Sequence, residues 1–276
     1  MVRRRAAEAA MKGRPFQLYD AFGAAPGEGN PAAVLLVDGW PSEAAMRAVA
    51  GELNAWTAFV VGAAGRYAVR VFSIAPIVEN EMCGHALLAA ARALFDGPER
   101  GGEALLLQAR GGPVAAWPTP DGAAIDFPAI AVEPTPAPPW AALLGGRPRA
   151  WWRRAAGYPA YVALYETEPE LAALPADPAA LRGVEALMLA TAPGSDADFA
   201  SRLFAPMKSL IEDPAGGTQH ALAAPFWAAR LGRSELSGVS RSARGGRCLC
   251  RVEGGRVRIA APVTLAAEGR LLLPLR

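Results

Sequence analysis

The chain has 276 residues, 52% of them hydrophobic and 20% charged, which predicts a well-packed protein of one large domain or two ordinary ones. A formal net charge of +2 excludes nucleic-acid binding by charge alone, and the longest apolar runs are interrupted before they could span a membrane. The three cysteines are too few for a disulfide framework, so we expect a cytoplasmic protein.

The first half is predicted to contain short strands and two helices after a disordered basic terminus at residues 1–14. Ser42 is a helix-capping residue and predicts a helix over residues 43–53. A longer, alanine-rich helix is predicted over residues 84–95, and it ends where Gly97 is followed by proline. The predicted strands of this half are 16–20, 32–37, 58–61, 67–72, 104–108, 114–117 and 124–127.

The second half repeats this order after a proline-dense segment, residues 134–139, which is the best candidate for a linker. Its alanine-rich helix is predicted over residues 219–231 and is closed by Gly232. The predicted strands are 161–165, 186–190, 247–252, 256–259 and 270–273. One apolar helix among many short strands in each half favours an α+β fold, with a curled mixed sheet around a buried central helix. The two halves are predicted to span residues 15–130 and 145–276.

The only two histidines, His85 and His220, occupy similar segments about half the chain apart. In each segment glycine precedes the histidine and an Ala/Leu-rich helix follows. The repeat predicts two pseudo-symmetric halves whose helix N-termini share one site. Because Gly84 and Gly217 allow close approach to the first N–H groups of each helix, a substrate carboxylate is the simplest ligand. Loop carbonyls and waters are the alternative partners of these groups.

Four motifs in a fixed order carry a resemblance to a known family. They are Gly29-Asn30-Pro31 after an aromatic-rich strand, Cys83-Gly84-His85-Ala86, Glu212-Asp213-Pro214-Ala215-Gly216-Gly217, and Arg244-Gly245-Gly246. Together they resemble the PhzF-like isomerase family, which is named for its phenazine-biosynthesis member and is related in fold to diaminopimelate epimerase. The resemblance covers nearly the whole chain, from about Phe16 to Leu272.

The resemblance implies a diaminopimelate epimerase-like fold with the active site in the cleft between the halves, and it allows the C-terminal strand to return to the first half. It also implies an isomerase that moves a proton within a small carboxylic or amino acid, with no metal and no organic cofactor. A homodimer stays open. Cys248 and Cys250 lack nearby partners for a zinc site and are interpreted as core residues.

The chain departs from the family at the usual acid/base residue. The family carries a glutamate in an Asn-x-Ser-Glu-Thr-x-Phe segment, whereas this chain has Asn54-Ala55-Trp56-Thr57-Ala58-Phe59. Trp56, which stands in place of the glutamate, does not exchange protons at useful pH, so we expect it to form an apolar wall against a substrate ring. Proton transfer has therefore moved to another residue or has been lost.

Four residues are candidates to replace the glutamate. Cys83 precedes the first long helix, whose positive end stabilises a thiolate, and His85 has a side chain that titrates near neutral pH. Asp213 matches a family residue that lines the site, and Glu81 offers a further carboxylate. Their structural alternatives are a core cysteine, a buried histidine bonded to backbone, a turn carboxylate and a solvated loop carboxylate.

Substrate binding is predicted at the N–H groups around Gly84, Gly217 and Thr218, with polar contacts from the Thr218 hydroxyl and the Gln219 amide. His220 is predicted either to contact the substrate or to serve the core or cap a helix.

These features predict a 1,3-proton shift that relocates a C=C or C=N bond in a small cyclic or unsaturated carboxylate. The resemblance points to secondary metabolism, including antibiotic pathways that build alkylated-proline units from pyrrolines. One alternative is an amino-acid epimerase that uses Cys83, with Asp213 or His85 on the opposite face of the substrate. The other is a catalytically inactive binding protein of the same fold.

Overall fold

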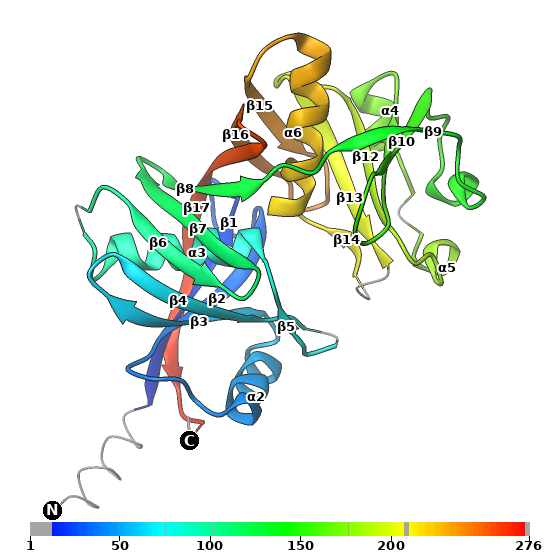
Figure 1. Cartoon of the computed structure of the whole chain (residues 1–276). Coiled ribbons are helices and arrows are strands. Elements are labelled where there is room, and N and C mark those ends of the chain that lie inside the picture. Colours follow the sequence, from blue (N-terminus) through cyan, green and yellow to red (C-terminus); the bar gives the residue numbers. More distant parts are fainter. Residues whose placement is uncertain (1–12, 75, 101, 176, 207–209, 274–276) are drawn as a thin grey trace, which may run out of the picture.

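The first half of the chain forms a closed barrel around helix α3 (Gly84–Asp96), and the second half forms a curled sheet around helix α6 (Gly217–Leu231) (Figure 1). The structure is a computed structural model that describes residues 13–74, 76–100, 102–175, 177–206 and 210–273. The predicted terminus, 1–14, lies almost wholly outside the described residues, and Arg14 already begins the first strand. No helix within the described ranges has the length and hydropathy needed to cross a membrane.

Eight strands close the barrel, and each pairs with the next around the ring. In order, they are β1 (Arg14–Ala21), β2 (Asn30–Leu36), β3 (Trp56–Ala63), β4 (Arg66–Phe72), β6 (Leu105–Ala109), β7 (Gly112–Thr119), β8 (Gly122–Pro128) and β17 (Arg256–Leu271). The β2–β3 and β4–β6 pairs are parallel. Because β17 pairs with both β8 and β1, the ring has no unpaired edge.

Helix α3 fills the barrel because its sequence is apolar on every side. Eleven of its thirteen residues are buried, and Leu87, Leu88 and Leu94 have no exposed surface. Burial of each of these leucine side chains stabilises the fold by about 2 kcal/mol. The predicted helix is confirmed, and it ends one residue later than expected, at Asp96.

The C-terminal strand β17 is sixteen residues long and runs the length of the barrel, as the red strand in Figure 1 shows. Its segment 256–262 pairs with β8, and its segment 263–271 pairs with β1. The prediction of two separate strands at 256–259 and 270–273 is therefore wrong. Pro262 breaks the strand pattern in the sequence, but it lies where the strand changes partners and is tolerated there.

The sheet of the second half passes through β9, β10, β11, β12, β13, β15 and β16, which pairs with β17. The bounds are β9 (Val132–Thr135), β10 (Ala150–Arg154), β11 (Ala160–Leu164), β12 (Leu187–Pro193), β13 (Phe199–Ala205), β14 (Leu210–Asp213), β15 (Glu235–Ser240) and β16 (Gly246–Glu253). Strand β14 pairs with the end of β13. Helix α6 packs against β12, β13, β15 and β16.

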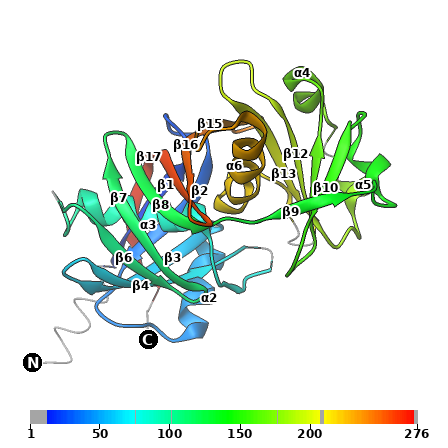
Figure 2. The ribbon, with the colours of Figure 1, turned by 45° about the horizontal axis from the view of Figure 1, so that its top comes forward.

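The chain crosses from β8 to β9 along α6, where the Ile130 N–H donates to the Ala221 carbonyl (Figure 2). The predicted linker, residues 134–139, is wrong at its start because Pro134 and Thr135 belong to β9. That strand pairs only with β10 among the described residues, and an edge strand tolerates proline. We propose 15–130 and 145–276 as the two halves, with β17 assigned to the first barrel.

The remaining elements lie outside the two central helices. Helix α2 (Glu43–Leu53) packs on β3 and β4 and has the predicted bounds. The Ser42 hydroxyl oxygen accepts a hydrogen bond from the Ala45 N–H, as the capping prediction requires. The short elements are β5 (Glu79–Asn80), the 3₁₀ helix η1 (Ala141–Leu144), α4 (Glu168–Ala172) and α5 (Pro178–Leu181).

Candidate active site

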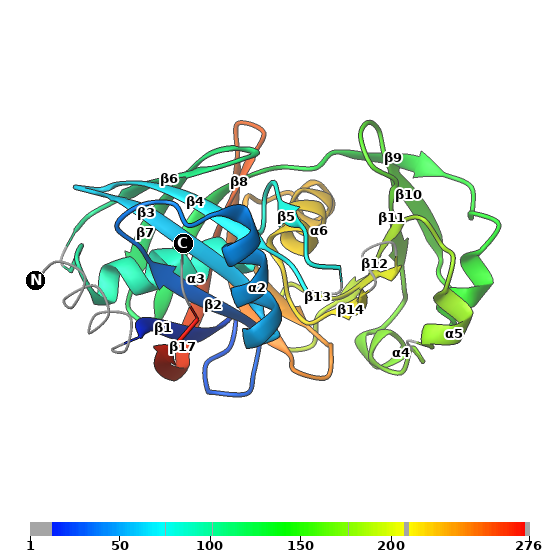
Figure 3. The ribbon, with the colours of Figure 1, turned by 90° about the horizontal axis from the view of Figure 1, so that it is seen from below.

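The N-termini of α3 and α6 meet at Gly84 and Gly217. Figure 3 shows α3 within the first half and α6 within the second. A Cβ atom built on Gly84 would lie 2.6 Å from the Gly217 Cα, and one built on Gly217 would lie 2.8 Å from the Gly84 Cα. Only glycine fits at either position. The N-cap residues, Cys83 and Gly216, form no side-chain capping bond, so the positive ends of two helices converge on one point that favours an anion.

Three side chains of the first half cluster beside this junction. The Sγ atom of Cys83 lies 3.5 Å from Nδ1 of His85, and the edge of the Trp56 ring packs on the imidazole at a centroid distance of 5.2 Å. Cys83, His85 and Trp56 are 6%, 4% and 9% exposed. The thiol and the imidazole therefore form a contact pair that Trp56 shields from bulk water.

Asp213 approaches the junction from the second half, at the end of β14. Its Oδ1 accepts a 2.6 Å hydrogen bond from Nδ2 of Asn30, and the same amide donates to the Ala215 carbonyl at 2.7 Å. A Cβ atom built on Gly216 would lie 3.1 Å from Asp213 Oδ2, which places this carboxylate at the start of α6. Asn30 is a positioning residue that the sequence analysis left without a role, although the Gly-Asn-Pro motif contains it.

A second network holds the loop that precedes Asn30, the first residue of β2. The Arg244 guanidinium donates to the Gly29 carbonyl at 2.7 Å and to Oδ1 of the buried Asp20 at 2.8 Å. The other Asp20 oxygen accepts from the Gly27 N–H at 2.8 Å. The Arg-Gly-Gly motif thus fixes the loop before β2, and through Asn30 it fixes Asp213.

The side chains of His220 and Gln219 are both fully buried. The His220 ring is fully buried, lies 2.8 Å from the Gly216 carbonyl through Nδ1, and stacks on Phe22. Burial lowers the pKa of His220 to about 4, so the ring is neutral at physiological pH and Nδ1 is the donor. The Gln219 amide donates to the hydroxyl groups of Ser201 and Ser240. This geometry favours the core role for His220 and does not bring Gln219 to the junction.

The two histidines also differ in helical position. His85 is the second residue of α3, whereas His220 is the fourth residue of α6. Two residues correspond to a rotation of about 200° around a helix axis, so the two rings leave opposite sides of their helices. The counterpart of His85 in α6 is Thr218.

Thr218 lines a cavity of about 420 Å³ between the two halves. The first half contributes Glu79, Asn80, Glu81, Met82, Gly111, Phe127, Pro128 and Ile130, and the second contributes Arg154, Tyr158 and Thr218. The Phe127 ring is the link to the junction, because a Cβ built on Gly84 or Gly217 would lie about 3.5 or 3.4 Å from its Cε2. Of the predicted residues, Glu81 and Thr218 line this cavity, while His85, Cys83, Asp213 and Trp56 do not.

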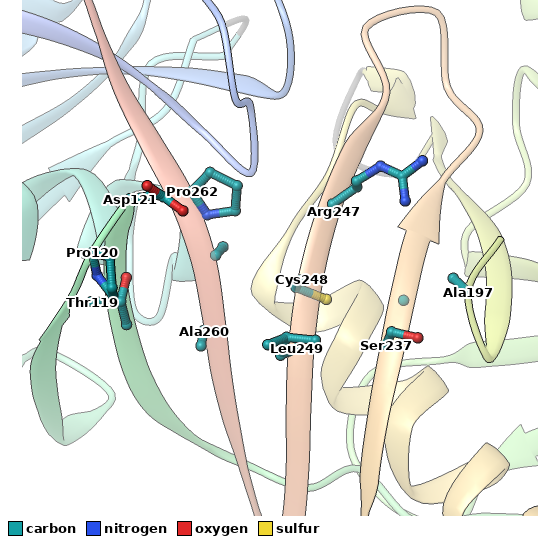
Figure 4. A pocket seen from close by; sticks show the side chains of 12 residues that line it. Thr119, Pro120, Asp121, Ala197, Ser237, Arg247, Cys248, Leu249, Ala260 and Pro262 are labelled. Carbon is teal, nitrogen blue, oxygen red and sulfur yellow. The ribbon is translucent and has the colours of Figure 1, made fainter.

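Another cavity, of about 370 Å³, lies on the outer face of β15, β16 and β17 (Figure 4). Its walls include Leu249, Ala260 and Pro262, and it contains none of the predicted site residues. Cys248 also lines it, and its Sγ lies 3.6 Å from that of Cys250. Both cysteines are buried, as predicted. No group of three or more His, Cys, Asp or Glu side chains in the described part of the chain could hold a metal ion.

Sequence relatives match almost the whole chain. The family model described as phenazine biosynthesis-like protein matches residues 19–135. An uncharacterized isomerase of Pseudomonas aeruginosa is 38% identical over 256 residues, which cover 92% of this chain and 97% of the relative. A second uncharacterized isomerase of the same bacterium is 36% identical over 273 residues, with coverages of 94% and 98%.

Solved structures agree with the sequence matches. A phenazine biosynthesis protein of the PhzF family from Enterococcus faecalis matches with a TM-score of 0.85 and 34% identity, covering 93% of this chain and 98% of the other. A probable proline racemase from Agrobacterium radiobacter, solved with bound carbonate, shares the fold with a TM-score of 0.62 at 12% identity and coverages of 95% and 93%. The predicted resemblance and fold class are confirmed. The chain belongs to the phenazine biosynthesis-like (PhzF) family of isomerases.

Proposed function

We propose that this enzyme catalyses a cofactor-independent 1,3-proton shift in a small cyclic or unsaturated carboxylate. The observation that carries the proposal is the contact between Gly84 and Gly217, which joins two positive helix ends beside titratable groups of both halves. Cys83 and His85 belong to the segment that begins α3, and Asp213 belongs to the segment that precedes α6. A carboxylate held at the junction would therefore meet proton carriers from both halves.

The reaction needs one group to remove a proton and one to return it. A base takes a proton from a saturated carbon next to the double bond, the electron pair moves across three atoms, and a proton is added at the far carbon. We assign these steps to His85 and Asp213, with Cys83 as the neighbour that exchanges a proton with the imidazole. The bond from Asn30 fixes one oxygen of Asp213 and leaves the other directed toward the start of α6.

The substrate carboxylate is assigned to the N–H groups of Gly84, Gly217 and Thr218. Negative charge also grows on the conjugated carboxylate as the proton leaves, so the two helix ends would stabilise the transition state more than the bound substrate. Trp56 supplies an apolar surface beside the imidazole, which suits a flat ring better than the usual glutamate would.

A pyrroline carboxylate of an antibiotic pathway is one small substrate candidate for this shift. It is flat and small, and its C=N bond can move by the proposed shift. The three cysteines are free thiols, which supports our assignment of the enzyme to a reducing cytoplasm.

The test is hydrogen exchange in D2O with a panel of pyrroline carboxylates, dienyl carboxylates and common amino acids. Deuterium uptake together with a change in ultraviolet absorbance is the expected result. His85→Ala and Asp213→Asn should each reduce the exchange rate by about a hundredfold or more, in the range of general acid–base contributions. Cys83→Ala measures the role of the thiol, and Cys248→Ala is its control because that cysteine is buried away from the junction.

Other outcomes identify the alternatives. Uptake with inversion of configuration and unchanged absorbance would replace the proposal with a one-thiol epimerase. Binding without any exchange, for substrates that bind tightly, would mean that the loss of the glutamate at position 56 abolished the chemistry.

A further inference from the structure

Arg154 presents an unusual donor to the cavity between the two halves. It is the last residue of β10, and its Nη1 atom is buried without a hydrogen-bond partner among the described residues. Arg153, its neighbour on the strand, is exposed and paired with Glu133 at 2.8 Å. Arg154 lines the cavity, and no ion pair joins it to a carboxylate among the described residues, so it is the one of the two that can meet an anion there.

The guanidinium of Arg154 is held in a fixed orientation. One face lies over the Tyr158 ring at 4.2 Å from its centroid. A Cβ atom built on Gly157 would come within 2.9 to 3.1 Å of the guanidinium atoms, so the backbone at that glycine packs closely on the group. A stacked guanidinium loses little further entropy when it binds a planar anion.

The other charges of the cavity leave room for an added anion. The carboxylate of Glu79 is bound by Arg70 through two hydrogen bonds of 2.6 and 2.8 Å, and this pairing lowers its pKa. Glu81 is exposed at the rim, where solvent weakens its effect. Among the charged residues that line the cavity, Arg154 is the one with a buried nitrogen that has no hydrogen-bond partner among the described residues.

Tyr158 contacts both Arg154 and the start of α6. A side-chain hydrogen bond joins Tyr158 to Thr218, while the guanidinium lies over the face of the same ring. Tyr158 is 36% exposed, and desolvation raises the pKa of its phenol. The guanidinium thus borders the face of the ring and Thr218 borders its hydroxyl edge, so the two groups contact different parts of Tyr158.

We propose that the enzyme selects a substrate with a second acidic group, and that Arg154 binds this group while the helix N-termini bind the first. The proposal rests on the proposed function for the position of the first carboxylate. The substrate class is a short, unsaturated dicarboxylate. Met82, Phe127 and Ile130 supply the apolar wall along its length, and Tyr158 borders the opposite side.

Binding of two matched probes tests this proposal. Muconate is a conjugated diene with a carboxylate at each end, and sorbate is a diene of the same length with a methyl group in place of one carboxylate. Calorimetry with the full chain should show that muconate binds about tenfold to a hundredfold more tightly than sorbate, as expected for a hydrogen bond to a charged group. Arg154→Gln should remove this difference and leave sorbate binding unchanged. Arg153→Gln, the matched control, should preserve it.

Removal of a negative charge at the rim should have the opposite effect on the affinity for muconate. Glu81→Gln should strengthen muconate binding by a few-fold because it removes a like charge from the same cavity.

Equal affinity for the two probes, or no binding of either at millimolar concentration, would overturn the proposal. An equal loss of both probes in Arg154→Gln would also overturn it, because Arg154 would then serve the first carboxylate or the fold. The measurement needs no turnover, so it is independent of the proposed reaction. If the enzyme isomerises monocarboxylates but binds the two probes equally, the proposed function stands and the proposal of a second acid site fails.

Discussion

Replacement of Gly84 by alanine should separate the two halves at the active site. The new Cβ atom would lie 2.6 Å from the Gly217 Cα, whereas carbon atoms in contact prefer about 3.5–4.0 Å. The helix ends must therefore move apart by roughly 1 Å. Overpacking of this kind destabilises proteins by about 1–3 kcal/mol, and we expect the upper part of the range because the new Cβ would meet the Cα and N of Gly217, which are backbone atoms. A gain of up to about 1 kcal/mol in helix propensity offsets it, which leaves about 2 kcal/mol.

Activity should fall further than stability in this variant. A displacement of about 1 Å between catalytic groups reduces rates by about a hundredfold. Urea unfolding gives the loss of stability, and the deuterium-exchange assay gives the loss of rate. Gly217→Ala should behave alike, and the double variant should be no worse than additive because both changes remove the same contact.

Gly51→Ala is the matched control for this experiment. It also lies in a helix, but its Cβ would meet only the end of the Ile77 side chain, at 3.1 Å, which can move. It should be as stable as the wild type or slightly more stable. If Gly84→Ala matches this control in both stability and exchange rate, the two helix ends are not in contact and the argument for a shared site fails.

Three further predictions concern the groups around the junction. Asn30→Ala leaves the Asp213 carboxylate without its donor, so urea unfolding should show a loss of about 2 kcal/mol and the exchange rate should fall; an unchanged rate would remove Asp213 from the mechanism. His220 has a pKa of about 4 in the folded protein and 6.5 ordinarily, so the unfolded chain takes up a proton first as the pH falls. Stability should therefore be complete above pH 6.5 and decline by roughly 3 kcal/mol toward pH 4 in urea melts, and His220→Asn should flatten this decline. Arg202→Met leaves Glu212 of β14 without its ion-pair partner and should lower stability by about 3–5 kcal/mol in urea, whereas a double change of both residues to apolar ones should recover much of the loss.

Elements with local signals were predictable from the sequence. The Ser42 cap defined the start of α2, and the bounds of that helix agree with the prediction. The glycine before Pro98 likewise located the end of α3 to within one residue. In these places a single turn of backbone decides the structure, so neighbouring residues contain the needed information.

Strands defined by distant partners were missed. Strand β13 is buried on both faces and therefore shows no alternation, and it contains Ser201 and Arg202, which suggest a surface. Their burial is tolerated because the Gln219 amide donates to Ser201 and the Glu212 carboxylate accepts from Arg202. These partners are 18 and 10 residues away, and their geometry is fixed only in the folded sheet.

The candidate site shows the same division. The start of α3 at Gly84 agrees with the prediction, whereas α6 begins at Gly217, two residues before its predicted start. The direction of His220 depended on its position within the turn, and the sequence similarity to the His85 segment concealed that difference. Arg154 gave no local signal, since it becomes a cavity residue only when β10 is placed opposite β8.

The path of β17 has a consequence for the order in which the protein can be assembled. The ring around α3 lacks one strand until β17 is present, although β1 and β8, which flank the gap, are more than a hundred residues earlier in the chain. During synthesis on the ribosome, the edges of β1 and β8 would remain unpaired beside α3 until β17 emerges. The second half, by contrast, can form most of its sheet first. The first half is thus made first but completed only when β17 pairs with it, so its strand edges are open to pairing with other chains in the meantime.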